Sequence, residues 1–182
     1  KLLSVNEPDG IGKQERTLIM TDNLLARLFE HNNWAILRII EACSALSDEQ
    51  LDAEPRSATM GSIRNTLSHL VGAQAGYLSL LTLPIEARIR VTPALDELQE
   101  TAKKSGAGLL ALARGEKSMD ARLETKDGYY VEPWVVMVQI INHATEHREQ
   151  ICSMLTAQGI TPPDMDGWSY GEAENALIPI PK

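Results

Sequence analysis

Two histidines stand four residues apart in the segment IINHATEHREQI, residues 140–151. The apolar residues around them recur at helical spacing and form one stripe: Val136, Ile140, Ile151 and Met154. His143 and His147 fall on that same stripe, although a buried imidazole needs partners for both ring nitrogens. Two neutral imidazoles at this spacing can point at one spot and bind a divalent transition metal. The competing interpretation is a pair of histidines hydrogen-bonded to their neighbours, in the core or at the surface.

A third nitrogen ligand would have to come from His31 or His69, the other two histidines of the chain. His69 lies on the flank of the apolar face of one predicted helix, and His31 lies on the flank of another. The apolar pattern by itself does not distinguish between them.

Two polar residues beside the histidines are candidates for catalysis. His143 to His147 spells H-x-x-E-H, the inverted signature of a class of zinc proteases, in which Glu146 would be the general base. That signature normally occurs in much larger enzymes, and a solvated or ion-paired Glu146 is the alternative. Gln150 lies nearer the histidine line, where its amide could hold a ligand or a bound water, or could simply bond to the backbone.

The elements that must position these residues are helices. Apolar periodicity predicts one helix from an N-cap at Thr21 or Asp22 to about residue 46, and a second from about residue 61 to the residue before Pro84. A third opens with Thr92 as its cap and Pro93 at its first position and continues through Leu112, with Gly106 and Gly108 weakening its middle. The last begins at Pro133 and is closed by Gly159. Lys-Asp-Gly divides two short extended segments within residues 121–132, as in a hairpin. We therefore expect an all-α fold, a four-helix bundle with one hairpin-like segment between helices 3 and 4.

Composition limits the remaining possibilities. The chain of 182 residues is the size of one domain, and no apolar run reaches the ~20 residues of a membrane span. A net charge of −8 argues against nucleic acid as a partner. The first residues lack the apolar centre of a secretory signal, so we expect a cytoplasmic protein. Cys43 and Cys152 sit in helical apolar patterns and are expected to be reduced core residues.

Three segments resemble the DinB/YfiT-like family of small four-helix-bundle metalloproteins: HNNWAILRIIEACSALSDEQL, GSIRNTLSHLVGAQAGYL and NHATEHREQICSMLTAQGITPPDMD. The resemblance implies a DinB-like metal-binding bundle over residues 20–182, preceded by an extension at residues 1–19. It also implies a divalent metal, zinc or nickel, held by His69, His143 and His147, and so prefers His69 over His31. Where the family often has an acidic residue after the second-helix histidine, this chain has Gln74.

The family includes transferases and isomerases that use low-molecular-weight thiols such as bacillithiol or mycothiol. The resemblance therefore implies a thiol-dependent S-transferase that acts on a small electrophile, with Gln150 orienting and Glu146 moving a proton. The alternatives are a metal-dependent hydrolase with Glu146 as base, and a non-catalytic metal-binding bundle that acts by protein interaction. A homodimer is expected because the family often pairs and because Trp34 points away from its helix's apolar stripe.

Overall fold

The computed structural model describes residues 13–55 and 60–181, and for residues 13–23 only the backbone. Four long helices lie side by side: α1 (Lys13–Ser44), α3 (Ile63–Thr82), α4 (Leu98–Ala113) and α5 (Pro133–Ala157). Between and after them come α2 (Asp48–Asp52), the two-residue strands β1 (Leu123–Glu124) and β2 (Tyr130–Val131), and α6 (Gly167–Ala173). The all-α four-helix bundle and its hairpin, which pairs β1 antiparallel to β2, are thus confirmed.

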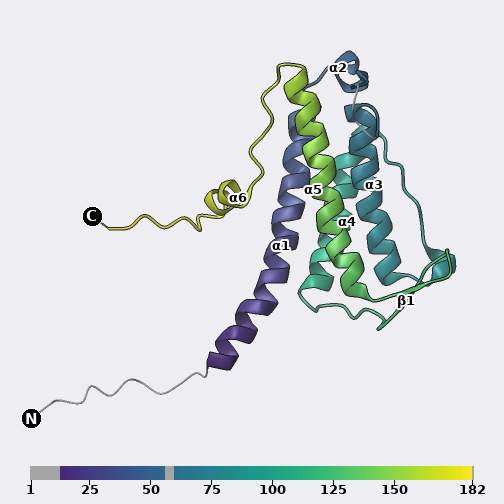
Figure 1. Ribbon diagram of the computed structural model, residues 1–182, viewed down its shortest axis with the longest axis vertical. Coiled ribbons are helices and arrows are strands. Elements are labelled where there is room, and N and C mark those ends of the chain that lie inside the picture. Colours follow the sequence, from purple (N-terminus) through teal and green to yellow (C-terminus); the bar gives the residue numbers. More distant parts are fainter. Residues whose placement is uncertain (1–12, 56–59, 182) are drawn as a thin grey trace, which may run out of the picture.

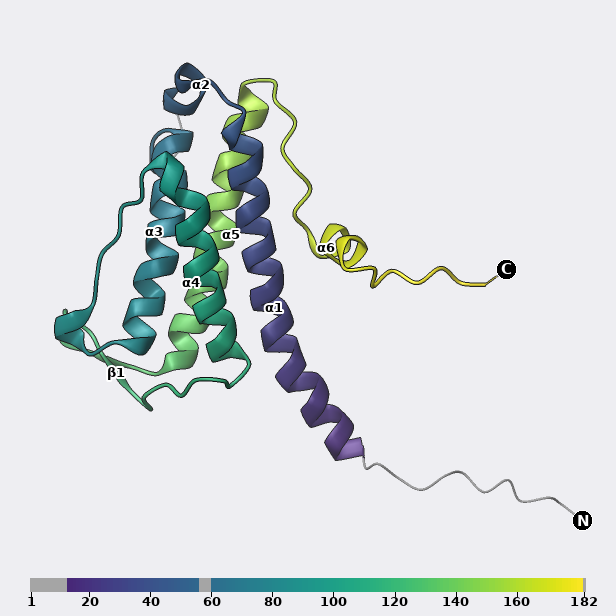
Figure 2. The ribbon, with the colours of Figure 1, turned by 180° about the vertical axis from the view of Figure 1, so that it is seen from behind.

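The order of the helices explains one long connection. α1 and α3 each pack against both α4 and α5. In Figure 1 α1 and α5 run in one direction along the bundle, and α3 and α4 run in the other. Because α3 and α4 are parallel neighbours, the chain between them must return along the bundle, and Figure 2 shows it passing along the outer side of α3.

Fully buried side chains from all four long helices fill the interior. The largest of them include Phe29, Ile36, Ile39, Leu67, Leu70, Leu98, Leu109, Ile140 and Ile151. Burial of these apolar faces supplies the main driving force for assembly of the bundle. The core therefore fixes which face each helix turns inward.

Local signals set several helix ends, and those at Pro133 and Gly159 are as predicted. The Ser47 hydroxyl accepts from the Gln50 N–H, and the Gln50 side chain accepts from the Ser47 N–H, which completes a capping box at α2. Pro133 is the first residue of α5. Gly159 follows α5 with φ of +74°, a conformation that glycine adopts without a Cβ penalty.

Two predicted helix starts are wrong. α1 begins at Lys13, so Thr21 and Asp22 lie inside the helix and not at its start. No Pro or Gly interrupts residues 13–22, and an N-cap residue does not by itself stop a helix. α1 also crosses the expected boundary at residues 19 and 20 without a break, and residues 1–12 of the expected extension lie outside the described residues.

The third helix begins later than the cap at Thr92 predicted. A single 3₁₀ turn, Leu95–Glu97, precedes α4, and the Glu97 carboxylate accepts from the Ala94 N–H at 2.9 Å. Thr92 and Pro93 belong instead to the long connection that lies on α3.

The two glycines of α4 allow close packing. A Cβ on Gly106 would lie 2.8 Å from the side chain of Asn33, and one on Gly108 would lie 2.5 Å from Leu78. The Asn33 amide donates to the Gly106 carbonyl at 2.9 Å. The residues predicted to weaken the helix are therefore the ones that let it approach α1 and α3.

The segment after α5 returns along α1 as far as α6 (Figure 1). Asp166 caps α6 by accepting from the Ser169 N–H at 2.8 Å, so DMDG forms the start of a helix. Trp34 packs against Tyr170 of α6, with ring centroids 5.3 Å apart. Its position off the core stripe is thus accounted for within the chain, and the homodimer stays a prediction.

Cys43 is buried and Cys152 is half-buried, and both are free thiols, as predicted. No helix in the described part of the chain is long and apolar enough to span a membrane.

Candidate metal centre

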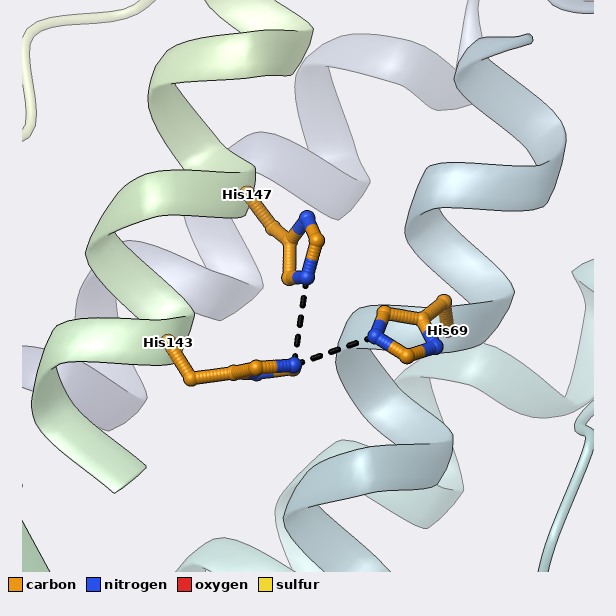
Figure 3. Close-up of side chains that lie close together, drawn as sticks. All are labelled: His69, His143 and His147. Carbon is orange, nitrogen blue, oxygen red and sulfur yellow. Dashed lines mark hydrogen bonds between the residues drawn. The ribbon is translucent and has the colours of Figure 1, made fainter. Parts of the chain in front are cut away.

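Three histidines from two helices converge at one point in the bundle. His69 comes from α3, and His143 and His147 come from successive turns of α5. The Nε2 atom of His143 lies 3.0 Å from Nε2 of His69 and 3.1 Å from Nε2 of His147. Figure 3 shows the three rings pointing toward one another. The structure thus brings together the three residues that the sequence offered as metal ligands.

The remaining histidine lies elsewhere. Nε2 of His31 is 2.8 Å from the carbonyl oxygen of Met165, and its ring lies against Trp34 and Tyr170. His31 therefore helps to hold the C-terminal segment against α1 and takes no part in the cluster.

Gln150 fixes the tautomer of one ring. Nδ1 of His147 lies 2.9 Å from Oε1 of Gln150, one turn further along α5. Because the amide oxygen only accepts, Nδ1 must donate its proton, and Nε2 of the neutral ring keeps a free lone pair. Gln150 thus acts from behind His147, the position of a residue that orients a metal ligand.

Neutral imidazoles cannot satisfy both nitrogen contacts at the centre of the cluster. Nε2 of His147 is an acceptor, so its contact with His143 needs a proton on Nε2 of His143. A proton placed there points at one neighbour only, and the contact with His69 is then left without a hydrogen bond. A cation between the three nitrogens removes this conflict, because all three lone pairs can then point inward.

The spacing of the nitrogens suits such a cation. Bonds from a divalent transition metal to imidazole are about 2.1 Å long, so two ligand nitrogens lie roughly 3.0 Å apart at a right angle and roughly 3.4 Å apart in a tetrahedron. The observed separations are 3.0 and 3.1 Å, and the three ligand atoms all lie within 4.8 Å of one another. The donor set therefore fits a divalent metal and leaves further coordination positions for water or substrate.

The electrostatics of the cluster keep two of its rings neutral. Partial burial, followed by the proximity of His147 and His69, lowers the pKa of His143 to about 4. The pKa of His69 is also lowered, first by burial and then by His147 and Arg90. At neutral pH these nitrogens carry lone pairs available to a metal, with little competition from protons.

The acidic candidate is placed differently. Glu146 is exposed, and no hydrogen bond or ion pair joins it to the histidines in the part of the chain that the structure describes. It is not a member of the ligand cluster either. The geometry thus supplies no contact for the predicted general base.

Gln74, which stands where the family often has an acid, has a structural role. It is buried, and its amide donates to the carbonyl of Ala102 at 3.1 Å and to the hydroxyl of Ser105 at 2.8 Å. It therefore joins α3 to α4.

Arg148, next to the last histidine, is buried between α5 and α1. Its guanidinium donates to Asn32 at 2.7 Å and to Thr145 at 3.0 Å, and burial lowers its pKa to about 10. The hydrogen bond to Asn32 joins α5 to α1 at the residue after His147.

A cleft of about 540 Å³ lies on the outer side of α3, next to the cluster. Its walls include His69 and Tyr77 of α3 and residues 90–92 of the connection to α4. Tyr77 is half-buried and presents its ring nearly at a right angle to that of His143, at 5.7 Å between centroids. Sequence reasoning missed Arg90 in this wall. The only signal for it was the alternation of charged and apolar residues in RIRV, residues 88–91, within an otherwise irregular segment.

A four-helix bundle with a crossover connection and an open three-histidine centre defines a class of helical proteins that could hold a metal. The chain belongs to the DinB family, whose model matches residues 20–180. A crystal structure of a protein from Exiguobacterium sibiricum 255-15, described as a DinB family member, shares the fold with a TM-score of 0.62. The two are 17% identical over 80% of this chain and 97% of that chain. None of the curated proteins matches the chain.

Proposed function

We propose that the chain binds one divalent transition metal, zinc or nickel, through His69, His143 and His147, and acts as a thiol-dependent S-transferase on a small electrophile. The observation that carries the metal part is the conflict between three Nε2 atoms at 3.0 and 3.1 Å, which a cation resolves. Imidazole nitrogen suits both zinc and nickel. Family membership supports the transferase part, since the resemblance to DinB proteins is what points to thiols.

The residues around the centre have separable roles in this proposal. When bound, the metal would supply a Lewis acid that favours the thiolate form of a coordinated thiol. Gln150 holds His147 in the tautomer that can ligate. The neutral state of His143 leaves its nitrogen available at physiological pH. The cleft beside His69 and Tyr77 gives a small electrophile room to approach from the solvent side.

A hydrolase would need a base beside a metal-activated water. Glu146 is the residue that the sequence offers for this role, and its exposed position without a contact to the cluster does not favour it. A Glu146→Gln substitution should therefore leave any thiol transfer within about twofold of wild type. Loss of an ester or amide hydrolysis in this variant would instead support the hydrolase.

Metal analysis of protein purified without a histidine tag tests the first half of the proposal. We expect close to one equivalent after reconstitution, and loss of it in His143→Ala. His31→Ala is the matched control, because that imidazole lies against the C-terminal segment and should leave occupancy unchanged. Folding of both variants is checked by circular dichroism. An empty reconstituted wild type, or full occupancy in His143→Ala, contradicts the ligand assignment.

The second half is tested with cobalt in the site. A thiol that ligates cobalt adds a strong sulfur-to-metal absorption, so titration with a panel of cellular thiols reports direct binding. If a thiol binds, turnover with small electrophiles follows as the next assay. If the protein binds metal but shows no response to thiols and no turnover, the result would favour the non-catalytic metal-binding bundle.

A further inference from the structure

The connection between α3 and α4 forms one wall of the cleft and is fixed in place. We call residues 83–94 the strap. The Ile89 N–H donates to the Ser79 hydroxyl at 3.0 Å, and the Ser68 hydroxyl donates to the Pro93 carbonyl at 2.8 Å. The strap is thereby held to α3 at Ile89 and at Pro93, on either side of residues 90–92.

Its middle lies even closer to the helix. A Cβ on Gly72 would lie 2.3 Å from the carbonyl oxygen of Val91, a distance that no side chain tolerates. Glycine at this position therefore lets the strap lie directly on α3. Arg90, the residue between Ile89 and Val91, is consequently carried on anchored backbone at the edge of the cleft.

Arg90 is a cation without an ion-pair partner among the side chains that the structure describes. Its guanidinium is near enough to His69 to contribute to the lowered pKa of that imidazole. In the described ranges, 13–55 and 60–181, it forms no ion pair. Its neighbour Arg88 differs, because Arg88 donates to the carbonyls of Leu83 and Glu124 and so ties the strap to the hairpin.

The surroundings of Arg90 strengthen its field. Among the described residues, the side chains that line the cleft include no Asp or Glu, although the whole chain carries a charge of −8. A hollow of about 350 Å³ shares Arg90 with the cleft and is lined by two further cations, Arg88 and Lys126, against one acid, Asp127. This end of the cleft is thus a local positive region in an acidic protein, which attracts anions.

We propose that the cleft takes a ligand that carries a carboxylate or phosphate group, which Arg90 binds while the reacting end of the ligand lies at the three histidines. The role given to the reacting end rests on the proposed function; the anion preference does not. A guanidinium suits this task because its planar fork donates two parallel hydrogen bonds to either group. Among thiols, we therefore expect the cleft to bind preferentially those that carry a negative charge away from the sulfur.

A pair of probes of equal length tests the charge preference. 3-Mercaptopropionate and its neutral amide, 3-mercaptopropanamide, are titrated into metal-free protein and followed by amide chemical shifts in NMR. We expect the carboxylate to bind about threefold to fivefold more tightly, the size of a partly exposed ion pair. Arg90→Gln should abolish the difference. Arg38→Gln, the same change at an exposed arginine that lies over Trp34, should retain it. Inorganic phosphate is titrated in parallel, and the tighter anion identifies the preferred group.

The cobalt-loaded protein separates this inference from the proposed function. If neither thiol changes the cobalt spectrum but the anion still binds through Arg90, the thiol chemistry fails and the anion site stands. If both thiols ligate cobalt with equal affinity, or if the preference persists in Arg90→Gln, the inference is overturned. Absence of saturable binding of either anion to the wild type also overturns it.

Discussion

Acidification should weaken metal binding at this centre less than at three ordinary imidazoles. Protons compete with a metal for each ligand nitrogen, and an imidazole with a pKa of about 6.5 loses roughly tenfold in available lone pairs between pH 7.5 and 5.5. Three such ligands would together cost roughly a thousandfold in affinity. The pKa of His143 is lowered to about 4, so its nitrogen stays almost fully deprotonated across this range. That of His69 is lowered as well. We therefore expect the metal affinity to fall by about a hundredfold or less between pH 7.5 and 5.5.

Isothermal titration of zinc into metal-free protein at pH 7.5, 6.5 and 5.5 measures this directly. The measurement is repeated in two buffers of different ionisation enthalpy, so that the protons released on binding are counted separately. Fewer than one proton per imidazole should be released at pH 5.5, because His143 has none to lose.

A loss of a thousandfold or more, with three protons released at pH 5.5, would refute the reasoning. It would mean that the rings open to solvent and titrate normally when no metal is present. His31→Ala is the control, since that ring is outside the cluster and should leave the pH dependence unchanged.

Four further outcomes are expected. In the metal-free protein the free energy of unfolding should fall by about 1–2 kcal/mol as pH drops from 6.5 to 4, after allowance for partial exposure of His143. The unfolded chain takes up this proton at higher pH than the folded one, and urea titrations at several pH values would show it. Gly106→Ala should destabilise the protein by about 1–3 kcal/mol, because its Cβ would clash with Asn33 of α1. Gly76→Ala should stabilise it by about 0.5–1 kcal/mol, because a Cβ there meets no atom within 4 Å. Thermal unfolding of the two variants measures both effects. Asn32→Leu should cost about 2–3 kcal/mol by removing an acceptor from buried Arg148, and adding Arg148→Met should recover most of the loss in chemical denaturation. Light scattering at about 50 μM should show a dimer, and a monomer at that concentration would argue against an interface of usual size.

The sequence predicted the bundle because four long apolar patterns with clear end signals leave few other folds. Pro133 and Gly159 bounded α5 correctly because each acts through its own backbone. The start of α1 was wrong because Thr21 can cap a helix but does not prevent one from continuing.

The candidate site shows the same division between local and non-local information. The two histidines of α5 share a face because of helical spacing, which one sequence reveals. The choice between His31 and His69 depended on packing, since α1 and α3 are both neighbours of α5. What decides it in the structure is that His31 faces the C-terminal segment, whose return along α1 no periodicity indicates.

The strap illustrates the part that a sequence pattern cannot supply. Gly72 and Val91 are far apart in the sequence and meet because the strap runs back along α3. The parallel arrangement of α3 and α4 requires that path. An antiparallel pair would be joined by a short loop at one end of the bundle, and the outer side of α3 beside His69 would then have no second wall. The crossover provides that wall, while the three candidate metal ligands come from α3 and α5. In the proposed function, metal binding and the choice of small molecule are therefore assigned to different segments. Changes in the strap should alter which small molecule binds and leave the metal occupancy of the three histidines unchanged.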